Sequence, residues 1–314
     1  MKTISFFSYK GGAGRSTLAY NVIPILAAEH VKPTAENPII VIDTDVDSCG
    51  MSYLVRVDDQ VADDDCVSIQ QLLSSEISTN IDKYPSIEDH PFLSKLIPVG
   101  NAYGYKDNDA VLLLPAKDNK TIIEDSKSNY SDSSSNPFRP RMNDFLDVCN
   151  KYGVPMVIFD SSVGNTALAN LSNEIANVIV CVMRPTTQFV NGTRRYLLGV
   201  ENGEKMFEFG KHIVLVPNVI PQEEVVINGL KYPDGVISKI RIDFFNDFTE
   251  NSFYNYHFDM LDKEEFGIPA VKRFMWIEDA LYTKPSSELN ENETEALGRY
   301  RKLARIINEI EAEY

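Results

Sequence analysis

Cysteine and histidine are scarce in this sequence, and neither residue type is clustered. The chain of 314 residues has four cysteines and four histidines, and no two cysteines form a C-x-x-C pair. Zinc sites, iron–sulfur clusters and the disulfide frameworks of small secreted proteins need such residues at close spacing. The sequence therefore argues against all three, and it favours reduced thiols in a cytoplasmic protein.

Positive charge is also in short supply. Lysine and arginine number 30 against 46 aspartates and glutamates, which gives a formal net charge of -16. Such a surface repels the phosphates of nucleic acids and anionic lipid headgroups, so DNA is disfavoured as a ligand of the surface as a whole. Arg184, Arg194 and Arg195 leave a small DNA- or partner-binding patch open, although a solvated face is the simpler interpretation.

Long hydrophobic runs are missing as well. No stretch is apolar for long enough to span a bilayer, and the first residues lack the apolar core and cleavage site of a signal peptide. Near the end of the chain, Leu303, Ile306, Ile307 and Ile310 share one face of an amphipathic segment. A membrane-targeting helix is one interpretation, but the acidic finish favours a helix that docks its apolar stripe on the sheet.

The residues that are present predict an α/β protein. Short apolar runs alternate with segments of helical period, which indicates a doubly wound, mostly parallel sheet with helices on both faces. The predicted strands are Thr3–Ser8, Pro38–Asp43, Ala110–Leu114, Pro155–Asp160, Val178–Met183, His212–Pro217 and Ile268–Phe274. The predicted helices are Ser16–His30, Ser68–Ser75, Pro140–Tyr152, Asn165–Ala176 and Glu293–Glu313.

Two segments look inserted into this alternation. Residues 118–137 form a serine-rich polar stretch that predicts a loop, and residues 222–265 are rich in phenylalanine and tyrosine. The aromatic segment predicts an ordered subdomain or a partner surface. No internal repeat or break in composition demands a second domain, so we expect one domain over residues 1–314.

A glycine-rich turn follows the first predicted strand and leads into a helix, which is the context that a phosphate-binding loop requires. Its residues are Lys10, Gly11, Gly12, Ala13, Gly14, Arg15, Ser16 and Thr17. The glycines let backbone N–H groups approach phosphate oxygens, and the start of the helix adds the positive end of its dipole. Ser16 stands where its hydroxyl would contact Mg²⁺.

Carboxylates end two other apolar strands. Asp43 and Asp45 follow the run 39–42, and Asp160 follows the run 157–159. The carboxyl ends of parallel strands face the crevice where open sheets bind ligands, and carboxylates there can hold magnesium or orient a water molecule. A single such aspartate would more simply be a helix cap or a turn residue.

Together these motifs resemble the ParA/MinD family of deviant Walker A P-loop ATPases. The resemblance rests on the K-G-G-x-G-[KR]-[ST]-T loop, the D-x-D strand end and the later strand-end aspartate, with weaker similarities at 68–73, 112–116 and 267–271. It implies binding of ATP or ADP with Mg²⁺ and a homodimer in the ATP state. The implied function is an ATPase or switch that positions or recruits a cargo or partner protein.

The resemblance also implies roles for single residues. Lys10 is similar to the signature lysine that reaches the partner's phosphates across the dimer, and Asp45 to the residue that activates the hydrolytic water. Ser16 and Asp160 are similar to magnesium ligands, with Asp43 close to the metal. A further role concerns Asn218, which is similar to the asparagine that hydrogen-bonds adenine.

The chain departs from the family pattern in three places. Arg15 replaces the main P-loop lysine, and the prolines common after the two strand-end motifs are missing. Arginine keeps the charge but is larger and planar, so we expect nucleotide binding with slow or absent hydrolysis. A nucleotide-binding interaction protein without turnover therefore remains an alternative. Pro24 should also kink or end the helix after the loop.

Overall fold

The structure is a computed structural model, and it describes most of the chain. The described ranges are 1–57, 66–74, 77–117, 138–198, 211–221, 225–227, 230–232, 255–262 and 265–311, with single residues at 60, 136, 238, 240 and 242.

An eight-stranded sheet forms the centre, in the order β10-β7-β6-β1-β5-β2-β4-β3. Its strands are β1 (Lys2–Ser8), β2 (Ile39–Asp43), β3 (Ile97–Pro98), β4 (Val111–Leu114), β5 (Met156–Val163), β6 (Val178–Met183), β7 (His212–Pro217) and β10 (Asn255–His257). Every neighbouring pair is parallel except β3 with β4. The predicted, mostly parallel sheet is confirmed, and six of the seven predicted strands lie in it.

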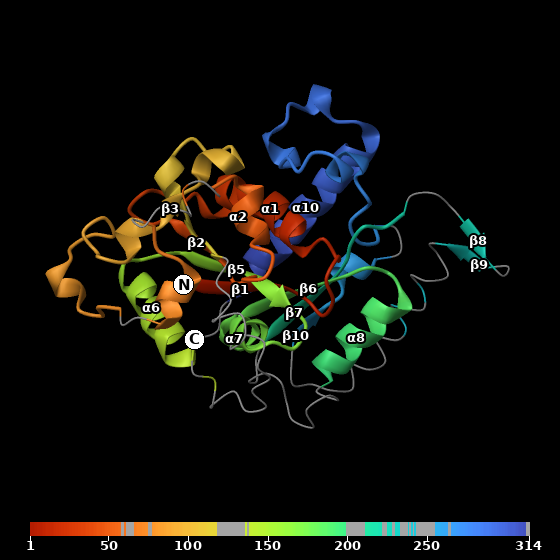
Figure 1. The fold of residues 1–314 in the computed structure, drawn as a ribbon. Helices are drawn as coiled ribbons and strands as arrows, with labels where there is room; N and C mark the ends of the chain where they lie inside the picture. The colour runs from red at the N-terminus through yellow and green to blue at the C-terminus, as the bar shows by residue number, and fades with distance from the viewer. Residues whose placement is uncertain are drawn as a thin grey trace.

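Helices cover both faces of this sheet (Figure 1). One face carries α1 (Arg15–Ile25), α2 (Gly50–Leu54) and α10 (Glu291–Glu309), and the other carries α4 (Ile69–Ser74), α6 (Arg139–Lys151), α7 (Ala167–Ile175) and α8 (Thr187–Leu197). Alternate strand residues therefore enter opposite layers: Ile39 and Val41 pack with α1, whereas Ile40 and Ile42 pack with α6. Burial on both faces explains why the strands are apolar throughout.

Short 3₁₀ helices fill several connections. They are η2 (Ile81–Lys83), η3 (Leu93–Lys95), η4 (Gly100–Tyr103), η5 (Asn108–Ala110), η7 (Asp259–Leu261), η8 (Lys272–Met275), η9 (Leu281–Thr283) and η10 (Ser286–Glu288).

Pro24 changes the course of the first helix as the sequence predicts. The α-helical hydrogen bonding of α1 ends at Ile25, and a π-helix, η1 (Leu26–Val31), continues the chain. Proline lacks the N–H that would bond one turn back, so the regular ladder is broken there.

The predicted strand Ile268–Phe274 is wrong. Only an isolated bridge between Ile220 and Pro269 forms in this stretch, and the chain turns into η8 at Lys272. The proline cannot donate to a ladder, so the apolar run does not extend into a strand. The edge position beside β7 belongs instead to β10, which pairs with it in parallel.

The two predicted insertions fall largely outside the described residues. Of the polar stretch 118–137 only Asn136 is described, and its side-chain amide donates to the Ala167 carbonyl oxygen at 3.0 Å. The aromatic stretch 222–265 contributes β10 and a separate hairpin of β8 (Val225–Ile227) with β9 (Leu230–Tyr232).

The C-terminal amphipathic helix docks on the protein. Leu303 and Ile307 of α10 are fully buried against α1, in the same core layer as strand residues of the sheet. The helix therefore packs in the way that the docking interpretation predicts. Among the described helices, none is long and apolar enough to cross a membrane.

Candidate functional site

The glycine loop lies at the point where the sheet changes winding direction. β1 and β5 are adjacent strands, yet α1 follows β1 on one face while α7 follows β5 on the other (Figure 1). The connections leaving such neighbours diverge and open a crevice at the carboxyl ends of the strands. The loop between β1 and α1 forms one wall of that crevice.

The backbone of the loop requires its glycines. Gly12 and Gly14 have φ angles of +84° and +76°, a region that side chains with a Cβ rarely adopt. A Cβ on Gly11 or Gly12 would meet no atom within 4 Å, so these residues face open space. The first turn of α1 contains no acidic residue, and no side chain caps its start. Its N–H groups are therefore available to an anionic ligand.

Asn218 holds the backbone of the loop through its side-chain amide. Its side-chain nitrogen donates to the carbonyl oxygens of Ala13 and Gly14 at 2.9 and 3.3 Å. A Cβ on Gly14 would lie 2.8 Å from that nitrogen, so this glycine also makes room for Asn218. The structure thus places Asn218 beneath the loop, where it fixes the loop's shape, and the adenine contact stays a prediction.

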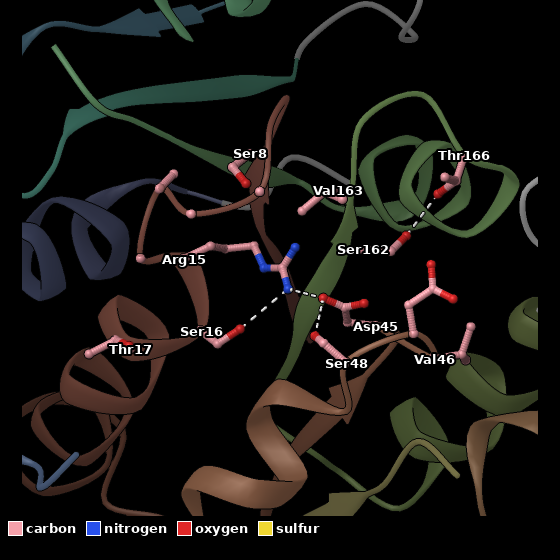
Figure 2. A pocket seen from close by; sticks show the side chains of 15 residues that line it. Ser8, Arg15, Ser16, Thr17, Asp45, Val46, Ser48, Ser162, Val163 and Thr166 are labelled. Carbon is pink, nitrogen blue, oxygen red and sulfur yellow. Dashed lines mark hydrogen bonds and ion pairs between the residues drawn. The ribbon is translucent and has the colours of Figure 1, made fainter. Parts of the chain in front are cut away.

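A cavity of about 470 Å³ opens over the loop. It is lined by residues of the loop, of the segment after β2 and of the segment after β5: Ser8, Gly11, Gly12, Ala13, Gly14, Arg15, Ser16, Thr17, Asp45, Val46, Asp47, Ser48, Ser162, Val163 and Thr166 (Figure 2). Seven of the eight predicted loop residues therefore line one cavity together with Asp45. Lys10, Asp43, Asp160 and Asn218 lie outside its lining.

Arg15 contacts carboxylates. Its Nε donates to Asp160 Oδ1 at 2.7 Å and its Nη2 to Asp45 Oδ2 at 2.8 Å, and the arginine is only 5% exposed. Nη2 also donates to Ser16 Oγ at 3.3 Å, and a dashed line marks this contact in Figure 2. Arg15, predicted to stand in place of the P-loop lysine, thus joins Asp160 within β5 to Asp45 beyond the end of β2.

Asp43 is satisfied within the protein. Its Oδ2 accepts hydrogen bonds from the Ser52 backbone N–H at 3.0 Å and the Ser52 hydroxyl at 2.9 Å, and its Oδ1 accepts from the Asp45 N–H at 3.1 Å. It pairs in register with Asp160 on the neighbouring strand. Burial, and then the charge of Asp160, raise the pKa of Asp43 to about 7. Asp43 acts as an anchor for the turn after β2.

Asp160 is the most enclosed of the three carboxylates. Burial raises its pKa, and the nearby charge of Arg15 opposes that rise. Its second oxygen, Oδ2, is buried without a hydrogen-bond partner among the described residues, and the same holds for Arg15 Nη1. Two polar atoms of opposite character are thus left unpaired beside the cavity.

Comparison with solved structures finds the same fold over nearly the whole chain. A variant of Cyanothece McdA with one aspartate changed to alanine, in complex with ATP, is 12% identical with a TM-score of 0.55, and the match covers 100% of this chain and 98% of that one. The septum site-determining protein MinD of Pyrococcus horikoshii OT3 with Mg-ADP is 14% identical with a TM-score of 0.55, over 98% and 96%. A putative plasmid partition protein of Borrelia burgdorferi bound to AMPPNP is 13% identical with a TM-score of 0.52, over 98% and 97%.

This chain has the MinD/ParA fold. The resemblance predicted from the loop and the strand ends is thereby confirmed at the level of the fold. No protein-family model and no curated protein sequence matches the chain.

In this MinD/ParA fold, Lys10 stands at the outer end of the loop. Its side chain is exposed, and Nζ donates to Gln188 Oε1 at 2.7 Å, in the first turn of α8. The adjacent Tyr9 packs closely on the same helix, because a Cβ on Gly192 would lie 2.3 Å from its ring. The structure connects the predicted signature lysine to α8.

Two serines next to the site were not predicted from the sequence. Ser48 donates to Asp45 Oδ2 at 2.8 Å, and Ser52 holds Asp43. Gly50 was missed too: a Cβ there would lie 2.9 Å from Ser16 Oγ, so the turn after β2 packs directly on the start of α1. The signal for all three lies in the short Ser/Gly-rich stretch 48–52, directly after the D-x-D strand end.

Proposed function

We propose that this chain binds ATP or ADP at the glycine loop. The observation that supports this most strongly is the uncapped start of α1, where the loop glycines open into a cavity of about 470 Å³ at the switch point of the sheet. Backbone N–H groups and the helix dipole both favour the phosphate groups of a nucleotide there. The cavity volume falls in the range of small-molecule sites, about 300–1,000 Å³.

We further propose that ATP joins two copies of the chain face to face, and that the dimer recruits a partner or cargo. Lys10 supports this idea, because its side chain is exposed next to the loop and its contact with Gln188 is an exposed one. An ammonium group in that position can turn to the phosphates of a facing copy. If the dimer binds ATP better than the monomer does, ATP shifts the population towards the dimer.

Part of the predicted magnesium site fits the ion. The hydroxyl of Ser16 lines the cavity and is an oxygen donor of the kind that Mg²⁺ prefers. Asp160 fits less well, because it lies outside the cavity lining and one of its oxygens is paired with Arg15. Asp43 fits less well, because both of its oxygens already accept hydrogen bonds. Bound at Ser16, the ion would neutralise phosphate charge.

A second candidate function is nucleotide binding without turnover. The ion pair between Arg15 and Asp45 favours it, because Asp45 Oδ2 already accepts hydrogen bonds from Arg15 and Ser48. A carboxylate engaged in this way is a poor base for an attacking water. Phosphate release measured for wild type, Asp45→Ala and Arg15→Lys separates the two functions. Turnover lost only in Asp45→Ala supports the ATPase, whereas turnover gained only in Arg15→Lys supports the non-hydrolysing protein.

Calorimetry with ATP and ADP tests the binding itself. Gly11→Val places a branched side chain in the cradle, and we expect it to lower ATP affinity at least tenfold. Gly298→Val is the matched control, because a Cβ at this position of α10 also meets no atom within 4 Å but lies outside the loop cavity. No binding heat for wild type, or equal affinities of the two variants, would refute the proposed site.

Light scattering tests the dimer. With a non-hydrolysable ATP analogue, we expect the mass of wild type to double, and we expect Lys10→Ala to remain a monomer. An unchanged mass of wild type with the analogue would rule out the nucleotide-driven dimer.

A further inference from the structure

The Arg15 guanidinium occupies the space between the carboxylates of two neighbouring strands. It reaches Asp160, which lies within β5, with Nε and Asp45, which lies beyond the end of β2, with Nη2, at 2.7 and 2.8 Å. The Asp160 side chain is fully buried and that of Asp45 is 9% exposed. Both contacts are charge-assisted hydrogen bonds in a site with little water.

The charges around this contact need a cation. Asp43, Asp45 and Asp160 lie together on neighbouring strands, because Asp43 and Asp160 pair in register and the Asp45 N–H bonds to Asp43. Among the described residues, Arg15 is the cation that forms ion pairs with this group, and it contacts two of the three carboxylates. Buried carboxylates are costly unless they are paired with a cation or protonated, and Arg15 supplies the pairing here.

We propose that Arg15 replaces a divalent cation at the carboxylates of Asp45 and Asp160, so that the site holds nucleotide without a requirement for Mg²⁺. The nucleotide part of this inference rests on the proposed function, and the metal part does not. A divalent ion between these carboxylates would lie directly against the guanidinium. The two cations therefore exclude each other.

The shape of arginine suits this task better than that of lysine. The planar guanidinium presents separate nitrogens to two carboxylates on different strands, whereas an ammonium is a single point of charge. The third nitrogen, Nη1, is buried and has no partner among the described residues. The guanidinium is thus directed at the protein's own carboxylates.

Manganese titration without nucleotide tests the metal part, with Mn²⁺ followed by its electron paramagnetic resonance signal. We expect wild type to bind no Mn²⁺ at these carboxylates and Arg15→Gln to gain a site with at least tenfold higher affinity. Arg273→Gln is the matched control, because Arg273 contacts one buried carboxylate, Glu293, at 2.7 and 3.3 Å. One carboxylate alone does not make a comparable divalent site, so this control should behave as wild type.

Nucleotide affinity of the unaltered protein tests the other part and requires no variant to fold. We expect the dissociation constant of ATP for wild type to change less than threefold between EDTA and excess Mg²⁺. For Arg15→Lys, whose single ammonium reaches only one carboxylate, we expect a change of at least tenfold in favour of Mg²⁺.

The outcomes separate the two proposals. Mn²⁺ binding by wild type equal to that of Arg15→Gln, or no new site in that variant, overturns the inference about Arg15. A tenfold or larger dependence of wild-type ATP affinity on Mg²⁺ overturns it as well. If ATP binds neither in EDTA nor in excess Mg²⁺, the proposed function and the claim of metal-free nucleotide binding are both overturned. The manganese result still decides whether Arg15 excludes a divalent ion.

Discussion

Replacement of Arg15 by methionine removes the cation from a buried group of carboxylates while nearly keeping the length of the side chain. Two charge-assisted hydrogen bonds, at 2.7 and 2.8 Å, are lost, and Asp160 keeps no exposure to water. Each ion pair at about 4 Å corresponds to about 4 kcal/mol of attraction at an effective dielectric constant near 20, before the cost of desolvation. Breaking one buried pair typically costs about 3–5 kcal/mol, so we expect a loss of that size here.

This loss should depend on pH in a defined direction. Burial raises the pKa of Asp160 and the charge of Arg15 lowers it, so without the arginine the pKa of Asp160 rises further. Protonation then relieves the unpaired charge. We therefore expect the deficit of Arg15→Met to be largest near pH 8 and to shrink as the pH falls towards 5.

Urea denaturation at pH 8, 6.5 and 5 measures both effects, with the free energy of unfolding taken by linear extrapolation. In a thermal scan at pH 8 the expected shift is about 5–8 °C for a chain of this length. A matched double variant, Arg15→Met with Asp160→Asn, should recover part of the loss because it removes the stranded charge. A deficit below about 1 kcal/mol at pH 8, or one that grows on acidification, would refute the ion-pair reasoning.

Three further predictions concern the surroundings of the site. The pKa of Asp43 is raised to about 7, so the folded state binds the Asp43 proton more tightly than the unfolded state does. The stability that comes from this proton is lost as the pH rises from about 4 through 7. The free energy of unfolding of wild type in urea should fall over this range, and Asp43→Asn should flatten the fall. Gly50→Ala places a Cβ 2.9 Å from Ser16 Oγ and should lower the free energy of unfolding by about 1–3 kcal/mol, with part of it recovered in a double variant that also carries Ser16→Ala. Equal stabilities of the single and double variants would contradict the clash. Leu303→Ala in fully buried surroundings should lower the free energy of unfolding by about 2–5 kcal/mol, and a loss under about 1 kcal/mol would mean that α10 does not dock as described.

Regular hydrophobic patterns made most of the fold predictable. Strands covered on both faces are apolar throughout, so runs such as 39–42 and 178–182 could be recognised without any tertiary information. The strand predictions failed where the local sequence pattern and the long-range strand pairing disagree. The run 268–271 is apolar but contains Pro269, and the chain turns into a 3₁₀ helix at Lys272. By contrast, β10 is a three-residue strand with the polar sequence Asn-Tyr-His. Its place in the sheet depends on pairing with β7, which local pattern does not encode.

The candidate site likewise has residues that local sequence predicts and residues that only long-range contacts place. The loop, Asp45 and Ser16 could be assigned to one cavity because glycines and strand-end carboxylates carry their geometry in the sequence. The supporting contacts could not. Asn218 bonds to Ala13 and Gly14 from more than two hundred residues along the chain, and no local signal predicts that its amide turns to the loop.

For Arg15, the sequence indicates a positive charge after Gly14 but does not indicate which groups that charge contacts. A cation after Gly14 is compatible with two arrangements, one directed at phosphates and one directed at the protein's own carboxylates. The second holds because the guanidinium can span Asp45 and Asp160 at once, and because Asp43 adds a third carboxylate that raises the need for compensation. The substitution of lysine by arginine is therefore a change in what the cation contacts. A variant that restores lysine should return both the demand for a metal ion and the freedom of the cation to reach phosphate.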